Sequence, residues 1–182
     1  MEQIKVIKHT DGDDRCLENV VNYPIGKDQV LKAGFGIDMN NTKNAVTQFK
    51  KTAGYYNNEN KTKAFHYMVS YTTETAPTAE KAMELTKEIF KPITDSHLAA
   101  IGIHEKDRDG GKFHSHVAVS PTDFRNGSML YADNSTYYAL AQRVADVTGE
   151  AVQLTVRYDV PDSNKPKEWE CKKIFIPMSD DE

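Results

Sequence analysis

The clearest alternation of apolar and polar positions lies in residues 63–72, where large apolar side chains occupy every second position from Phe65 to Tyr71. A period of two is typical of a β-strand that buries one face. Other segments that alternate, or are short and apolar, predict further strands at residues 3–8, 97–105, 113–119, 152–158 and 173–178.

Segments with helical periodicity separate these strands. Thr78 is a candidate N-cap for a helix in which Ala82, Leu85 and Ile89 share a stripe, and Pro92 follows the expected end. Further helices are expected at residues 16–23, at 43–51 after the capping candidates Asn41 and Thr42, and from a cap at Ser135 to Gly149. We predict an α+β fold, one domain over residues 1–182, with a mainly antiparallel central sheet, helices on one face and the functional site on the other.

Composition places the chain among ordinary globular proteins. Of its 182 residues, 38% are hydrophobic and 27% charged, a balance that supports a real core. No apolar run is long enough to span a bilayer, and MEQIKVIKHT lacks signal-peptide features, so we expect a cytoplasmic protein without membrane insertion. Cys16 and Cys171 are far apart in sequence, which predicts two buried free thiols rather than a disulfide framework.

The charge distribution is uneven. The net charge of −4 lacks the basic excess usual in nucleic-acid-binding proteins. The stretch between Gly26 and Tyr67, however, contains seven lysines and three acidic residues, a local excess of +4. This stretch can follow a phosphate backbone, or it can simply be a solvated surface.

Three histidines are predicted to meet on one face of the sheet. In residues 113–119, His114 and His116 alternate with apolar residues and therefore point the same way. The turn chemistry of KDRDGGK predicts a hairpin with residues 97–105, in which His104 lies on the face opposite its isoleucines. Imidazole nitrogens bind several divalent metals, and three of them leave positions open for water or a phosphate oxygen. His9 and His97 lack such company and are expected to be structural.

Beyond this pattern, three ordered motifs carry a resemblance to a known family. IHEKDRDGGKFHSHVAVSP resembles the histidine motif of relaxases, the mobilization proteins of plasmids and conjugative elements, in particular the P-type (VirD2-like) members of the His-hydrophobic-His endonuclease superfamily. LENVVNYPIGKDQ is similar to the motif that presents their nucleophilic tyrosine, and FHYMVSYTTE to the motif whose serine approaches the DNA. The similarity spans roughly residues 16–156.

The resemblance implies a site- and strand-specific DNA endonuclease and transesterase. Tyr23 would attack the scissile phosphate at a transfer origin, form a 5′-phosphotyrosine and allow religation. His104, His114 and His116 would hold a divalent metal, Mg²⁺ or Mn²⁺ by expectation, with Zn²⁺, Ni²⁺ or Co²⁺ as alternatives. The serine of the third motif, Ser70, would approach the DNA. Separately from the resemblance, Lys27 follows Tyr23 by four residues and is expected to contact a neighbouring phosphate. The implied partners are single-stranded origin DNA, a relaxosome accessory protein and the coupling protein of a type IV secretion system.

The sequence also departs from the family pattern. The loop between His104 and His114 is longer than usual, and Lys106 stands where an acidic residue is common. The acid that orients a ligating histidine is therefore left open between Glu105 and Asp107. Relatives carry long C-terminal regions, so we expect a nuclease domain, with truncation from a longer protein left open.

Other interpretations stay open at this level. Tyr55 and Tyr56 are rival nucleophiles on chemistry alone. The three histidines also suit a metal-dependent hydrolase or oxygenase of a small substrate, or a non-catalytic DNA-binding relative. A replication initiator or transposase of the same superfamily differs in motif order and spacing.

Overall fold

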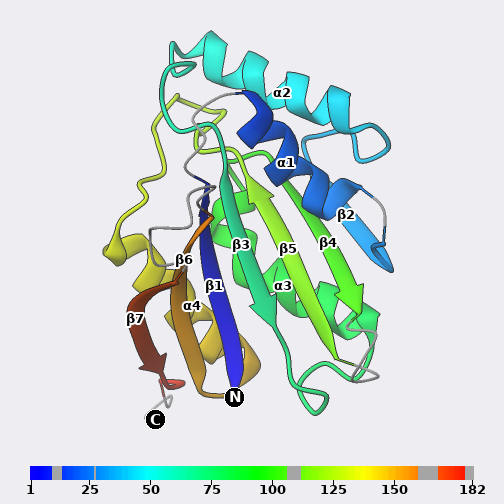
Figure 1. The fold of residues 1–182 in the computed structure, drawn as a ribbon, viewed down its shortest axis with the longest axis vertical. Helices are drawn as coiled ribbons and strands as arrows, with labels where there is room; N and C mark the ends of the chain where they lie inside the picture. The colour runs from blue at the N-terminus through cyan, green and yellow to red at the C-terminus, as the bar shows by residue number, and fades with distance from the viewer. Residues whose placement is uncertain (10–13, 27, 106–111, 160–167, 179–182) are drawn as a thin grey trace.

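The computed structural model, which describes residues 1–9, 14–26, 28–105, 112–159 and 168–178, has helices on both faces of one sheet (Figure 1). Within these residues the elements are β1 (Glu2–His9), α1 (Asp14–Ile25), β2 (Leu31–Phe35), α2 (Thr42–Tyr55), β3 (Phe65–Ser70), α3 (Ala79–Thr94), β4 (Ala99–Glu105), β5 (Phe113–Val119), α4 (Asn134–Thr148), β6 (Val152–Asp159) and β7 (Glu168–Phe175). The strand order is β2-β4-β5-β3-β1-β6-β7. β1 and β6 pair in parallel and the other neighbours are antiparallel, which confirms the predicted α+β fold.

The rear face of the sheet, covered by α3 and α4, forms the larger core (Figure 1). On β4 and β5, Ile101 and Val117 are opposite one another and fully buried. They belong to the same apolar cluster as Ile89 of α3. Thr78 caps α3 as predicted, because its side chain accepts a hydrogen bond from the backbone N–H of Lys81 at 3.1 Å.

The front face carries two helices that the sequence did not place there. α1 packs over it and α2 packs against α1, with Leu17 and Val46 in one apolar cluster with Ala100 and Ala118 of the sheet. Because strand side chains alternate, Ala118 faces the front while its neighbour Val117 faces the rear. The small alanines leave room for α1, so the face that holds the histidines is partly covered.

One strand was missed, and several elements have other ends than predicted. The last strand, β7, covers Glu168–Phe175 rather than residues 173–178, and α1 and α2 each extend beyond the predicted 16–23 and 43–51. β2 was missed because it is a short edge strand whose residues alternate between half-buried and exposed. α3 continues through Pro92 to Thr94 instead of ending before the proline. Proline at this position cannot donate to the carbonyl of Glu88. Arg143 of α4 replaces that donor, with its Nη2 at 2.7 Å from the Glu88 oxygen.

The last helix is capped two residues earlier than predicted. Asp133, not Ser135, is the N-cap of α4, and its carboxylate accepts from the backbone N–H of Thr136 at 3.0 Å. Asp133 has the extended backbone that an N-cap requires, whereas Ser135 already lies in the first turn. The predicted end at Gly149 is confirmed, with a left-handed φ of 71°.

Two further expectations concern composition. Cys16 is buried, as predicted, and the side chain of Cys171 lies outside the described residues. Among the described helices, none is long and apolar enough to cross a membrane.

Candidate active site

The three predicted histidines come together on the front face of β4 and β5. His104 is opposite His114 in the antiparallel register, and His116 follows two residues later on the same side of β5. The ring centroids are 5.3 Å apart for His104 and His114, 4.9 Å for His104 and His116, and 5.1 Å for His114 and His116. The alternation read from the sequence therefore leads to a cluster of three imidazoles in mutual contact.

A fourth imidazole, which the sequence analysis did not assign to the site, joins from β3. His66 is 1% exposed, and its Nε2 lies 2.8 Å from Nδ1 of His116, which is a hydrogen bond. The two histidines are diagonal neighbours, because Met68 of β3 is opposite His116. The alternation of residues 63–72 places His66 on the front face, but local sequence does not reveal which strand pairs with it.

Tyr23, near the end of α1, lies with its ring against two of these imidazoles. Its centroid is 4.7 Å from that of His66 and 5.0 Å from that of His116, stacked on the latter at 26°. The residue is nevertheless 44% exposed. Its backbone carbonyl accepts from the side-chain amide of Gln29 at 2.8 Å and lies 3.1 Å from Nε2 of His104. The tyrosine therefore borders the histidine cluster while remaining open to a substrate.

A glycine in β4 allows this arrangement. Gly102 is opposite His116, and a Cβ on it would lie 2.6 Å from the carbonyl oxygen of Pro24 and 2.7 Å from its Cα. Only glycine permits so close an approach of two backbones. Since Pro24 follows Tyr23 directly, Gly102 helps to set where the tyrosine lies.

Burial determines the charge state at the centre of the cluster. It lowers the pKa of His116 to about 3, with smaller contributions from His114 and His104. Desolvation disfavours the charged imidazolium, and neighbouring imidazoles add repulsion when they are protonated. His116 is therefore neutral at physiological pH, the form in which an imidazole nitrogen can bind a metal.

The types of side chain in the cluster suit a divalent metal, but their donor atoms are not arranged around a metal position. Among the described residues, no three histidine, cysteine or carboxylate side chains surround a common point as metal ligands. Nε2 of His104 is instead directed at the Tyr23 carbonyl. Three imidazoles in contact, one of them buried and neutral, are still a chemically suitable set.

The other candidate residues differ in how they relate to the cluster. Ser70 is half-buried at the end of β3 and opposite His114 in the register. Glu105 is exposed at the end of β4. Lys27 and Asp107, the remaining candidates for DNA contact and for orienting a histidine, lie outside the described residues.

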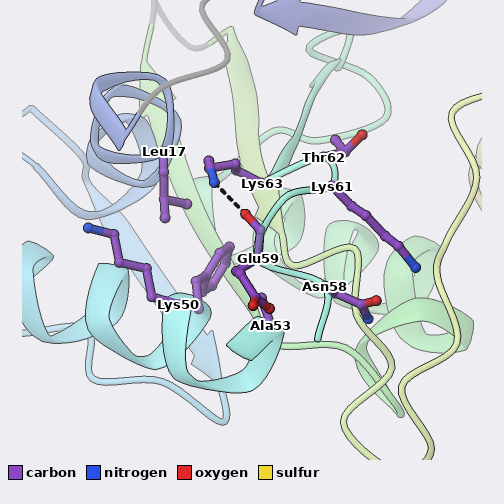
Figure 2. A pocket seen from close by; sticks show the side chains of 9 residues that line it. Leu17, Lys50, Ala53, Asn58, Glu59, Lys61, Thr62 and Lys63 are labelled. Carbon is purple, nitrogen blue, oxygen red and sulfur yellow. Dashed lines mark hydrogen bonds between the residues drawn. The ribbon is translucent and has the colours of Figure 1, made fainter. Parts of the chain in front are cut away.

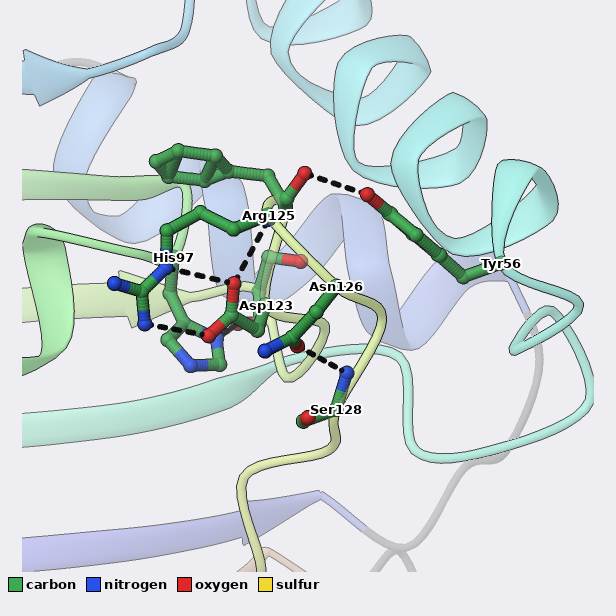
Figure 3. Close-up of polar contacts among 8 residues, drawn as sticks. Tyr56, His97, Asp123, Arg125, Asn126 and Ser128 are labelled. Carbon is green, nitrogen blue, oxygen red and sulfur yellow. Dashed lines mark hydrogen bonds and ion pairs between the residues drawn. The ribbon is translucent and has the colours of Figure 1, made fainter.

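The rival tyrosines make other contacts. Tyr55 packs edge-on against Tyr56, with ring centroids 4.8 Å apart. The Tyr56 hydroxyl donates to the backbone carbonyl of Phe124 at 2.8 Å (Figure 3). The hydrogen bond joins the end of α2 to the loop after β5. Tyr23, by contrast, contacts the site histidines.

His97 has the structural environment that the sequence analysis expected. It is buried, and its Nδ1 lies 2.8 Å from the carbonyl oxygen of Ser120. Nearby, Arg125 pairs with Asp123 at 3.0 Å and holds the pKa of that carboxyl below its ordinary value, mainly through a side-chain hydrogen bond (Figure 3). The side chain of His9 is not among those described.

Comparison with known proteins supports the family suggested by these motifs. The family model described as Relaxase, MobA/VirD2-like, nuclease domain, matches residues 22–151, more than half of the chain. Comparisons with curated proteins and with solved structures found no match. The matched segment includes Tyr23 and all four histidines of the cluster. The chain therefore belongs to the MobA/VirD2-like relaxases.

Proposed function

We propose that this protein nicks one strand of DNA at a transfer origin, with Tyr23 as the nucleophile. The observation that carries the proposal is the position of the Tyr23 ring, stacked on His116 and yet 44% exposed. A phenol has a pKa near ~10 and is a weak nucleophile at neutral pH, so it needs cationic or basic neighbours. Among the tyrosines considered from the sequence, Tyr23 is the one in ring contact with the histidine cluster.

The reaction is a transesterification that balances without a co-reactant. The Tyr23 oxygen forms a bond to the scissile phosphorus and loses its proton, while the bond from phosphorus to the 3′ oxygen breaks. The 3′ oxygen takes up a proton and leaves as a hydroxyl, and the 5′ phosphate stays on the tyrosine. Attack of a 3′ hydroxyl on this phosphotyrosine reverses the step and rejoins the strand.

His104, His114 and His116 are the proposed metal ligands. A divalent metal, Mg²⁺ or Mn²⁺ before Zn²⁺, Ni²⁺ or Co²⁺, would polarise a non-bridging oxygen of the scissile phosphate as a Lewis acid. Ligation through Nε2 would require His104 to exchange its contact with the Tyr23 carbonyl for the metal. The end of α1 would lose this contact when a metal binds, and we expect it to shift.

His66 is proposed to position His116 for this role. If His116 donates from Nδ1 to Nε2 of His66, its own Nε2 keeps a lone pair that can bind a metal. A partner of this kind fixes the tautomer and the ring orientation of a ligating histidine. His66 would then do for His116 what a carboxylate does in many metal sites.

Ser70 and Lys27 are proposed to contact the DNA. Ser70, a half-buried residue on the strand beside His114, would donate from its hydroxyl to a phosphate or sugar oxygen. Lys27 follows Tyr23 by four residues and suits a neighbouring phosphate. An accessory protein and a secretion coupling protein are the partners proposed for the complex at the origin.

The test is a cleavage assay on single-stranded DNA that carries the transfer origin of the protein's own element, with Mg²⁺ or Mn²⁺, analysed by denaturing electrophoresis. We expect a protein-linked 5′ product from the wild type and from Tyr55→Phe. Tyr23→Phe should lose it by at least about 10³-fold, because the nucleophilic oxygen is gone. Cleavage that survives Tyr23→Phe would favour metal-dependent hydrolysis, and binding without cleavage by the wild type would favour a non-catalytic relative.

A further inference from the structure

A pocket lies between α1, α2 and the loop that leads into β3 (Figure 2). Its cavity is about 190 Å³. Leu17 contributes from α1, the helix that also carries Tyr23, and Lys63 precedes His66 by three residues. The six residues from Leu17 to Tyr23 correspond to about 9 Å along the helix axis. One extended strand of nucleic acid can therefore reach both the pocket and Tyr23.

The lining of this pocket combines an apolar floor with a cationic rim. Leu17 and Phe49 are each 2% exposed and form part of the floor. The rim carries Lys50 from α2 and Lys61 and Lys63 from the loop. We call it the lysine pocket.

The local charge is opposite to that of the whole protein. Three lysines and one glutamate line the lysine pocket, a net charge of +2, whereas the chain as a whole carries −4. A depression on α3, on the rear face, shows the contrast, because its Lys87 and Lys91 are outnumbered by three acidic side chains. Positive charge gathered in one cleft attracts phosphate even when the chain is acidic overall.

The volume of the lysine pocket limits the group that can enter it to about the size of one ring system. An apolar cavity of roughly 150 Å³ can hold one benzene ring. A cavity of about 190 Å³ with an apolar floor suits one nucleobase, and a rim of ammonium groups suits the phosphates on either side of it. A base must be unpaired to enter, so the pocket fits single-stranded DNA rather than a duplex.

We propose that the lysine pocket holds one nucleotide of the single strand whose phosphate is presented to Tyr23. This inference rests on the proposed function for the identity of the strand. The base contacts the floor at Leu17 and Phe49, while Lys50 and Lys61 contact phosphates. Lys63 has a second task, because its Nζ donates to the backbone carbonyl of Glu59 at 2.7 Å and so holds the loop in place (Figure 2).

The test measures binding of a fluorescein-labelled oligothymidylate by fluorescence anisotropy over a range of salt concentrations, with EDTA present. This probe requires neither the origin sequence nor cleavage, so a failure of the lysine pocket is distinguishable from a failure of the nicking proposal. The variants are Lys50→Ala with Lys61→Ala, and Lys87→Ala with Lys91→Ala as a control that removes the same charge from α3. We expect the pocket variant to bind about tenfold or more weakly, with a salt slope smaller by about two.

A third variant separates the base from the phosphates. Ala53→Leu adds bulk inside the lysine pocket, removes no charge and places a good helix former in α2. It should also weaken binding, with its salt slope unchanged. Equal losses of affinity for the oligothymidylate in the two double variants, or normal binding by Ala53→Leu, would overturn the proposal.

Discussion

The two faces of the central sheet are built from the same strands and differ in almost every physical respect. On β5, Val117 and Val119 face the rear, are fully buried and pack in the larger core. Ala118, between them, and His116, just before them, face the front, where α1 lies. Because neighbours on a strand point to opposite faces, one segment serves both purposes.

The difference lies in how much volume each face fills. The rear face uses branched side chains that interlock with α3 and α4, so its contribution is to stability. The front face uses alanine, glycine and imidazole, which leave room for a helix and for Tyr23 to stay partly exposed. Of two neighbouring residues on β4, a mutation on the rear face should therefore lower the free energy of unfolding, and a mutation on the front face should lower the cleavage rate.

The largest expected effect is on the rear face, at Ile101. Ile101→Ala removes a fully buried side chain from the main core, and such changes cost roughly 2–5 kcal/mol in the free energy of unfolding. Urea unfolding measures this loss. The cleavage rate per folded molecule should stay within a few-fold of the wild type. A normal unfolding free energy together with lost cleavage would reverse the assignment of the two faces.

Mutation of the neighbouring residue, Gly102, should mainly lower the cleavage rate. In Gly102→Ala the new Cβ meets the backbone of Pro24, which cannot yield as a side chain does. The end of α1 must move, and a displacement of about 1 Å at a reacting group costs on the order of 100-fold in rate. Gly54→Ala is the matched control, because a Cβ there contacts nothing within 4 Å. Normal cleavage by Gly102→Ala would show that this close approach does not position Tyr23.

The sequence predicted the rear face more fully than the front. The alternation in residues 113–119 and the cap at Thr78 depend on local chemistry, and both predictions are confirmed. Convergence of His104 with His114 also followed, because a hairpin fixes its own register. The placement of α1 on the site face depends instead on small residues far away in sequence, such as Ala100 and Gly102.

His66 shows why part of the site was not found from sequence. Its face was correctly read from the alternation, but its partner is set by the pairing of β3 with β5 across 50 residues of chain. No local pattern encodes that pairing. The charged stretch had a similar limit, because the sequence counted lysines without showing that Lys50, Lys61 and Lys63 share one pocket.

The smallest expected effect tests what the fourth imidazole adds to the front face. His66→Phe keeps a ring beside Tyr23 and removes the hydrogen bond to His116, whereas His66→Gln keeps a polar group and removes the ring. Loss of a group that orients a metal ligand lowers metal affinity about 10–100-fold. We therefore expect a loss of this size for His66→Phe in Mn²⁺ titration calorimetry, and recovery of most of the affinity in His66→Gln.

Thermal unfolding of both variants without metal is the control, because His66 is buried and its replacement also affects packing. A structural role alone would weaken Mn²⁺ binding in proportion to lost stability, whichever side chain is introduced. A positioning role instead makes affinity follow the hydrogen bond, so the glutamine variant should bind Mn²⁺ more tightly than the phenylalanine variant even if it is less stable. If His66→Phe binds Mn²⁺ as the wild type does, His116 needs no partner, and the front face depends on three imidazoles rather than four.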